Sequence, residues 1–226
     1  MSAGPVKIGI LDTGCIGTVA ERKAFPAQDD PAWPAVTVND HGHRIATIIR
    51  THCPEAWLYD GRALTQGLAS STEQIASALE WLLEQQVHII NLSIGLRQDR
   101  QILADAICRA HDKNVLLVAS APALGSPVYP AAYHGVLAVT GDARCAAGDF
   151  ASLAPSSAGA PPHALDFGAA PGGPHHRAHS RGMGASFACA HVSARLAQLW
   201  LTSPAGADIV ERLHQQCLFR GRECQH

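Results

Sequence analysis

The chain has few aromatic residues, no excess of charge of either sign and no long apolar run. Of its 226 residues, 16% are charged and 5% are aromatic, and the formal net charge is −2 at pH 7. A charge so near zero provides no basic surface of the kind that binds nucleic acid or anionic lipid. No apolar run approaches the ~18 residues that a membrane-spanning helix needs. We therefore expect no nucleic-acid partner and no membrane partner.

Two further absences concern the compartment. No basic leader followed by a long apolar segment precedes the first apolar run, so we expect no signal peptide. The seven cysteines form no CxxC pair and their number is odd. This pattern is typical of reduced thiols that serve as small core residues. Cys217 and Cys224 would pair only in an oxidising compartment. We expect a cytoplasmic protein.

The hydrophobic content of 47% and the length fit one globular domain over residues 1–226. Apolar runs alternate with stretches of helical periodicity. Ser70 with Glu73 predicts a capping box at the start of one helix, and Asp99 predicts the cap of the next. Residues 17–38 are irregular, and residues 146–181 form mostly loops around short strands. The predicted strands are 6–11, 56–59, 87–92, 115–119 and 136–140, and the predicted helices begin near residues 41, 70, 99, 186 and 207.

Near-continuous apolar strands separated by amphipathic helices predict a mostly parallel sheet with helices on both faces. In such a sheet, functional groups gather at the carboxyl ends of the strands. Asp12 and Ser93 follow or end predicted strands, whereas His41 and Ser186 begin predicted helices. These residue types are the ones that nucleophilic catalysis requires.

The stretch GMGASFACAHVSA, residues 182–194, contains the candidate nucleophile Ser186. Ser186 stands at the start of a helix of small residues, where unpaired N–H groups and the helix dipole favour negative charge. Gly182 and Gly184 have no side chain to hinder an approaching peptide. The alternative is that Ser186 only caps an ordinary core helix.

Three blocks of the sequence together resemble the subtilisin-like serine peptidases, or subtilases. The aspartate block is IGILDTG at 8–14, the histidine block is DHGHRIATI at 40–48, and the serine block is GASFACAHV at 184–192. Supporting blocks are IINLSIG at 89–95, YPAAYHGVLAVTG at 129–141 and AAPGG at 169–173. The resemblance implies a subtilisin-like three-layer α/β fold and a serine endopeptidase with a catalytic triad.

Carried over block by block, the resemblance gives each candidate a role. Ser186 is the nucleophile, His41 the general base and Asp12 the acid that orients the imidazole. His43 is the competing base, and His41 is preferred because Ile45 and Ala46 then match the small apolar pair of the family motif. Without the resemblance, Asp12 could be a turn residue and His41 a helix-start residue.

The chain departs from the family at the oxyanion hole. Family members carry an Asn in the turn that here reads Ala119-Ser120-Ala121-Pro122-Ala123, and its position falls at Pro122 or one residue away. Pro122 and Ala123 have no side-chain donor. The candidates for the hole are the Ser186 backbone N–H, Ser120 and the Pro122 position, and Ser126 or a residue of the histidine-rich segment 174–179 could also replace the missing donor. Two hypotheses follow: a slow or specialised peptidase, or a catalytically weak or inactive module that binds peptides.

The resemblance also implies a peptide-binding edge at Ser93, Ile94, Gly95 and Leu96, to which an extended substrate adds a strand. Leu96 replaces a glycine common in the family, which predicts a narrower pocket and a preference for small or otherwise unusual residues before the cleaved bond. The expected partner is a peptide or protein substrate, with a second protein completing the cleft as a further possibility. Restricted processing, such as removal of a leader from a precursor peptide, is the expected role.

No cofactor and no metal are expected. The segment Pro174-His175-His176-Arg177-Ala178-His179 supplies three histidines, but without helical spacing or a neighbouring cysteine. No acidic cluster has the spacing of a calcium loop. We predict that the histidine-rich segment is a loop near the cleft.

Overall fold

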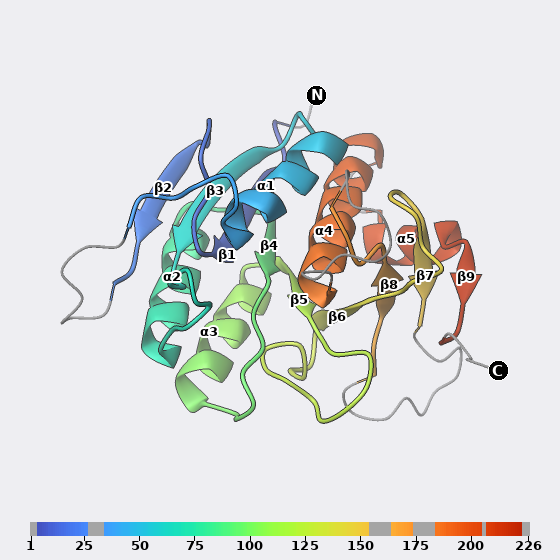
Figure 1. Cartoon of the computed structure of the whole chain (residues 1–226). Coiled ribbons are helices and arrows are strands. Elements are labelled where there is room, and N and C mark those ends of the chain that lie inside the picture. The colour runs from blue at the N-terminus through green and yellow to red at the C-terminus, as the bar shows by residue number, and fades with distance from the viewer. Residues whose placement is uncertain (1–3, 27–33, 154–163, 174–183, 205–206, 223–226) are drawn as a thin grey trace.

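The computed structural model describes residues 4–26, 34–153, 164–173, 184–204 and 207–222. In this part of the chain the strands form one sheet in the order β2-β3-β1-β4-β5-β6-β8-β7-β9, and Figure 1 shows β2 and β9 at its opposite edges. Only the β7–β8 pair is antiparallel. The strands are β1 Lys7–Asp12, β2 Glu21–Ala24, β3 Trp57–Arg62, β4 Ile89–Leu92, β5 Leu116–Ser120, β6 Val136–Gly141, β7 Phe150–Ser152, β8 Phe167–Ala169 and β9 Phe219–Arg220.

Helices cover both faces of this sheet. They are α1 His41–His52, α2 Thr72–Glu84, α3 Gln101–Asp112, α4 Ala185–Thr202 and α5 Ile209–Gln216. Successive strand residues point to opposite faces: Leu11 packs in a core with α2 and α3, and Ile10 packs in a second core with α1, α4 and α5. Figure 1 shows α2 and α3 together, away from α1 and α4. The prediction of a three-layer α/β fold with a mostly parallel sheet is confirmed.

Two predicted helix caps are wrong. The capping box of α2 is formed by Ser71 and Gln74, whereas the Ser70 hydroxyl donates to the carbonyl of Ala63 at 2.7 Å. Helix α3 has Arg100 at its N-cap without a side-chain cap, because Asp99 accepts a hydrogen bond from the hydroxyl of Tyr133 at 2.6 Å. In both cases a tertiary contact engages the polar side chain that the local pattern had favoured.

Strand β2 was missed by the sequence analysis, which treated residues 17–38 as irregular. Its four residues, Glu-Arg-Lys-Ala, are all exposed, so no apolar periodicity marks them. The strand forms because its backbone pairs with β3 in parallel. Charged side chains are typical of an edge strand, where they discourage pairing with other chains.

Helix α4 is the central helix of the second core. Eleven of its 18 residues are buried, including Ala188, Ala190 and Leu196, and small side chains allow it to lie close to the sheet. No helix within the described residues combines the length and apolar character needed to cross a membrane. Ser186 lies in the first turn of α4, at the same edge of the sheet as the carboxyl end of β1.

Candidate active site

Asp12 is the last residue of β1 and is fully buried. Its Oδ1 accepts a hydrogen bond from the Thr13 N–H at 2.7 Å. Its carbonyl accepts from the N–H groups of Ala63 and Leu64, at 3.0 and 3.1 Å. The chain then turns at Gly14, whose φ of +94° lies in the left-handed region that favours glycine. The strand end and this turn together fix the carboxylate of Asp12.

His41 is the first residue of α1, and its Nδ1 lies 2.9 Å from both carboxylate oxygens of Asp12. Gly42 makes this approach possible, because a Cβ at that position would lie 2.7 Å from the carbonyl oxygen of Gly14. The Gly42 N–H also donates to the Thr13 hydroxyl at 2.9 Å. The glycine of the histidine block therefore lets the start of α1 rest on the turn after β1.

The environment of His41 favours its protonated form. Burial of the imidazole lowers its pKa, but the hydrogen bond and the negative charge of Asp12 raise it by more, and the Arg44 charge lowers it again. The net result is a pKa above the ordinary histidine value. Because Asp12 accepts the Nδ1 proton, the neutral ring presents Nε2 as a proton acceptor. This is the tautomer that a general base requires.

His43 has a different environment. It is half-buried on α1, and burial together with the Arg50 charge lowers its pKa. Its hydrogen-bond partner is the backbone of Ile16, and its Nδ1 is buried without a partner among the described residues. Of the two histidines, His41 is the one that contacts Asp12.

Ser186 is the second residue of α4 and is half-buried. Gly184 occupies the N-cap position, so Ser186 does not cap the helix. Its own N–H lies in the first turn, where no helical carbonyl can accept it. The next residue, Phe187, packs its ring against the imidazole of His41 with centroids 5.6 Å apart. Within the described residues no hydrogen bond joins His41 to Ser186, as is common in free enzymes, where catalytic contacts tighten on substrate binding.

The turn after β5 provides little for an oxyanion. Ser120, the last residue of β5, is 8% exposed, and its hydroxyl donates to the carbonyl of Ile94 at 3.3 Å. Pro122 is exposed and has no N–H group. The Ser120 hydroxyl, which the sequence analysis had considered as an oxyanion donor, is therefore already hydrogen-bonded to Ile94. The roles predicted for Ser120 and Pro122 remain predictions.

The predicted peptide-binding edge follows β4. Ser93 is buried and accepts a hydrogen bond from Asn91 Nδ2 at 2.8 Å, and Asn91 Oδ1 accepts from the Ser193 hydroxyl of α4 at 3.0 Å. This network ties the edge to the helix that carries Ser186. The backbone N–H and C=O of Leu96 are both paired with Tyr129, at 2.7 and 2.8 Å. Ser93 to Gly95 are the residues of the predicted edge that precede this pairing.

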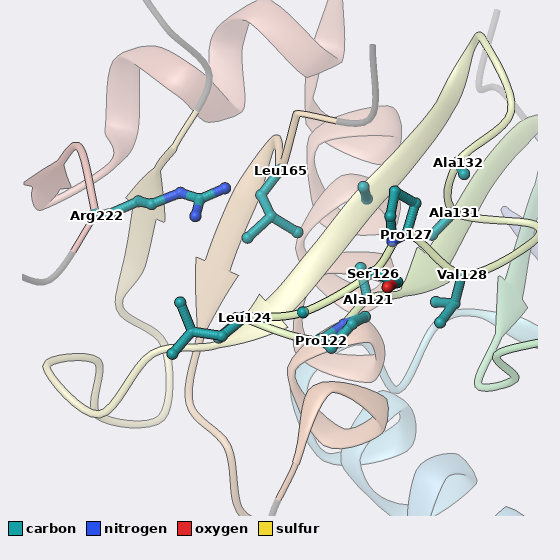
Figure 2. Close-up of a pocket in the computed structure, with 13 residues that line it drawn as sticks. Ala121, Pro122, Leu124, Ser126, Pro127, Val128, Ala131, Ala132, Leu165 and Arg222 are labelled. Atoms are coloured by element: carbon teal, nitrogen blue, oxygen red, sulfur yellow. The ribbon is translucent and has the colours of Figure 1, made fainter. Parts of the chain in front are cut away.

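A cavity of about 130 Å³ lies beside this edge, and Figure 2 shows the loop that forms it. Val128 closes the cavity toward the edge, since its Cγ2 lies 3.3 Å from where a Cβ on Gly95 would be. Leu96 is absent from the described residues that line it. The lining consists mainly of small or apolar side chains: residues 121–128 with Ala131, Ala132, Ala138, Leu165 and Arg222.

A second cavity of about 350 Å³ adjoins the first, since Ala123, Leu124, Leu165 and Arg222 line both. Gly141 also lines it, and a Cβ on Gly141 would lie 3.7 Å from the carbonyl carbon of Gly184. Gly184 precedes Ser186 by two residues, so the second cavity lies near the start of α4.

No metal site is found among the described residues, and the histidine-rich segment lies outside them. The described residues contain no group of three or more His, Cys, Asp or Glu side chains able to hold a metal ion. His175, His176 and His179, like Gly182, lie outside the described residues. Cys15, Cys53, Cys108, Cys145, Cys189 and Cys217 are free thiols, and Cys224 also lies outside the described part. Burial raises the pKa of Cys189, so it is a core residue and not a second nucleophile.

Three neighbours of the candidate site were not singled out as such by the sequence analysis. Thr13 fastens α1 to the turn after β1, Phe187 packs on His41, and Val128 narrows the cavity. Thr13 and Phe187 stand next to candidate residues in the sequence, which is a weak signal. Val128 gives none, because its proximity to Gly95 depends on how the loop folds back.

Comparison with known proteins agrees with the fold. The model of the subtilase family, peptidase family S8, matches residues 4–212. The minor extracellular protease Epr of Bacillus subtilis is 35% identical over 114 residues, which is 45% of this chain and 18% of that protein. The thermostable alkaline protease of Halalkalibacterium halodurans is 31% identical over 145 residues, covering 59% and 40% of the two chains.

A third relative, subtilisin Savinase of Lederbergia lenta, is 30% identical over 151 residues, covering 62% of this chain and 56% of that protein. The matches thus span between about a fifth and somewhat more than half of these relatives. The family model, in contrast, covers almost the whole of the present chain. The chain therefore belongs to the subtilase family.

Proposed function

We propose that this chain is a serine endopeptidase domain in which Asp12, His41 and Ser186 act as a catalytic triad. The observation that carries the proposal is the contact of His41 Nδ1 with both oxygens of the buried Asp12 carboxylate, at 2.9 Å. This contact leaves Nε2 as the proton acceptor, and the imidazole packs against Phe187, the residue after Ser186 in the first turn of α4. The arrangement is the one that activates a serine hydroxyl.

The mechanism follows from these positions. His41 Nε2 takes the proton of Ser186 as its Oγ attacks the peptide carbonyl, and Asp12 stabilises the imidazolium that forms. His41 then gives this proton to the leaving amine, which leaves an acyl group on Ser186. Water then attacks the acyl-enzyme as His41 takes its proton, and His41 returns that proton to Ser186 Oγ as the bond to the acyl group breaks and the acid product leaves. The Ser186 N–H is a donor for the oxyanion, because it has no acceptor within the helix.

We propose slow turnover, because the second oxyanion donor is weak. The Ser120 hydroxyl would have to leave the carbonyl of Ile94 to reach the substrate, and Pro122 has no N–H. In subtilisin, a member of the same family, loss of one oxyanion donor costs about 10²–10³ in turnover. Backbone donors of the loop from Ala121 to Val128 are the remaining source of stabilisation.

We propose that an extended peptide pairs with Ser93–Gly95 and places a small side chain in the cavity of about 130 Å³. Two features support this. The pairing of Leu96 with Tyr129 leaves no free backbone group at Leu96 for a substrate. Val128 narrows the cavity next to Gly95. A cleavage profile dominated by large aromatic residues would contradict this specificity.

A narrow pocket suits a restricted role, and we propose processing of a specific precursor, such as removal of a leader peptide, in the cytoplasm. The free thiols of the described cysteines are in keeping with a reducing compartment. A protein partner that completes the cleft is part of this proposal. It is tested by whether a precursor is cleaved by the isolated chain or only in the presence of a second protein.

The alternative is a peptide-binding module of low or no activity, which the absence of a side-chain donor at Pro122 and Ala123 favours. A fluorophosphonate probe separates the two functions. A peptidase labels covalently, and the label is lost in Ser186→Ala. A folded protein that binds peptides without labelling at high probe concentration would establish the binding module.

A further inference from the structure

Phe187 connects the two helices that carry the candidate base and nucleophile. Its side chain is 3% exposed. The guanidinium carbon of Arg44 lies 4.5 Å from the centroid of its ring, and the imidazole of His41 lies against the same side chain with centroids 5.6 Å apart and planes at 51°. His41 and Arg44 are three residues apart on α1, so they project from one face of that helix.

The three side chains form a small unit, hereafter the His41–Phe187–Arg44 cluster. The face of an aromatic ring attracts a cation, and a guanidinium stacks on it over a broad area. Phe187 directly follows Ser186, so any movement of its ring is coupled to the first turn of α4. Arg44 therefore holds the ring from one side while His41 contacts it as well.

We propose that Phe187 and Arg44 are positioning residues that hold the imidazole of His41 in the orientation needed for proton transfer from Ser186. The catalytic consequence rests on the proposed peptidase function, whereas the geometric consequence does not. Neither residue is assigned contact with the reacting atoms; both act through His41.

The charges around His41 give Arg44 a second effect. Asp12 approaches from β1 and accepts the Nδ1 proton. The first turn of α4 contributes no charged side chain. Asp40 precedes α1 and is hydrogen-bonded to Thr37. Arg44 is thus the positive charge that opposes the imidazolium, while Asp12 favours it.

Two further titratable groups lie behind this first set. Asp60 of β3 accepts a hydrogen bond from the Cys15 N–H at 3.0 Å, and burial raises its pKa. His43 faces the backbone of Ile16. Neither contributes to the shift in the pKa of His41. A change of charge at residue 44 should therefore change the pKa of His41 directly.

The test compares Arg44→Met, which removes the charge and keeps an unbranched apolar side chain, with Arg44→Lys, which keeps the charge and loses the planar stack. Loss of the positive charge stabilises the imidazolium, so Arg44→Met should raise the pKa of His41. The acidic limb of the pH profile for Ser186 phosphonylation by a fluorophosphonate should move to higher pH by the same amount. Arg44→Lys should leave the limb in place and lower the maximal rate.

Lys23→Met is the matched control, because Lys23 Nζ lies over the ring of Phe25 at 5.4 Å, a second cation–π contact that involves none of the proposed triad residues. It should change neither the pKa of His41 nor the rate. Phe187→Leu keeps an apolar core residue but removes the ring, and it should lower the maximal rate about tenfold. Circular dichroism and thermal unfolding establish that each variant is folded.

NMR titration of the His41 ring, assigned with His41→Ala, makes the result independent of activity. An unchanged pKa of His41 in a folded Arg44→Met variant would overturn the role of Arg44. An unchanged phosphonylation rate in folded Phe187→Leu would overturn the role of Phe187. If the wild type is not phosphonylated at all, the proposed function fails. The NMR titration then tests the influence of Arg44. The chemical shifts of the His41 ring in Phe187→Leu test that of Phe187: they should change, and unchanged shifts would overturn its role.

Discussion

The side of the site that holds Asp12, His41 and Ser186 is built differently from the side that would hold the substrate. Asp12 ends a strand, while His41 and Ser186 begin helices, and backbone and side-chain hydrogen bonds fasten the first two. The substrate side depends on the loop from Ala121 to Val128, of which Pro122 and Leu124 are exposed. The first side is positioned by regular structure, the second by loop contacts.

This difference indicates where the sequence can vary. Changing the ends of β1, α1 or α4 disturbs the packing of two cores, whereas changing the loop alters the fit of a substrate with little cost to the fold. The departures from the family pattern at Pro122 and Ala123 lie on this tolerant side. Arg44 lies on the side built from regular structure, where its guanidinium contacts the ring of Phe187.

Removing the proposed nucleophile should cause the largest loss of activity. Ser186→Ala should abolish peptide cleavage, since loss of the nucleophile in subtilisin, a member of the same family, costs about 10⁶-fold in turnover. The measurement is cleavage of a peptide library followed by mass spectrometry. Activity retained in this variant would show that another group, or a contaminant, performs the cleavage.

Asp12→Asn should have the next largest effect, a loss of about 10⁴-fold in turnover, because the amide favours the wrong imidazole tautomer. The negative charge that raises the pKa of His41 is also lost. NMR should therefore show this pKa falling, and with it the pH of the acidic limb of any residual activity. A limb that moves to higher pH would contradict the electrostatic account.

On the substrate side, turnover should rise when a hydrogen-bond donor for the oxyanion is introduced. Pro122→Asn or Ala123→Asn restores an amide near the position where the family carries one, and one of the two should raise turnover by up to about 10²-fold. Leu124→Asn is the positional control, because Leu124 belongs to the same loop and lines both cavities but lies beyond the position at which the family carries its Asn. Equal gains in all three variants would indicate a general effect on the loop and not an oxyanion donor.

Sequence reasoning predicted the places in the fold of residues that stand at the ends of regular elements. Asp12 ends β1, and His41 and Ser186 lie in the first turns of α1 and α4, as the apolar runs and helical periodicity indicated. Their catalytic roles remain predictions. Sequence reasoning failed where tertiary contacts outweigh local preference, as at Ser70, Asp99 and the polar strand β2. It could not foresee Val128 beside Gly95, because a loop contact between residues 33 positions apart leaves no periodic signal.

Enlarging the cavity of about 130 Å³ should change the cleavage specificity, with a smaller effect than the substitutions above. Val128→Ala removes the two methyl groups nearest Gly95, and it should shift cleavage toward larger residues by about tenfold relative to small ones. Profiling of cleaved peptides checks this change. Leu96→Ala is the matched comparison, since Leu96 does not line the cavity among the described residues, and its profile should stay near that of the wild type.

The smallest expected effect concerns the C-terminal end of α1, where the ring of His52 packs against that of His191 of α4 with centroids 4.9 Å apart. Burial lowers the pKa of both, so the unfolded chain binds protons more readily. The stability that this provides is present above about pH 6.5 and is lost as the pH falls through the folded values. Thermal unfolding should show a midpoint a few degrees lower at pH 5 than at pH 7, and His191→Gln should reduce this difference.

The structure of the protein after reaction with a fluorophosphonate tests the convergence of the three side chains most directly. We expect phosphorus bonded to Ser186 Oγ, His41 Nε2 within about 3 Å of the adduct, and Asp12 still bonded to Nδ1. A phosphonyl group on another residue, or His41 turned away from a modified Ser186, would contradict the proposed triad.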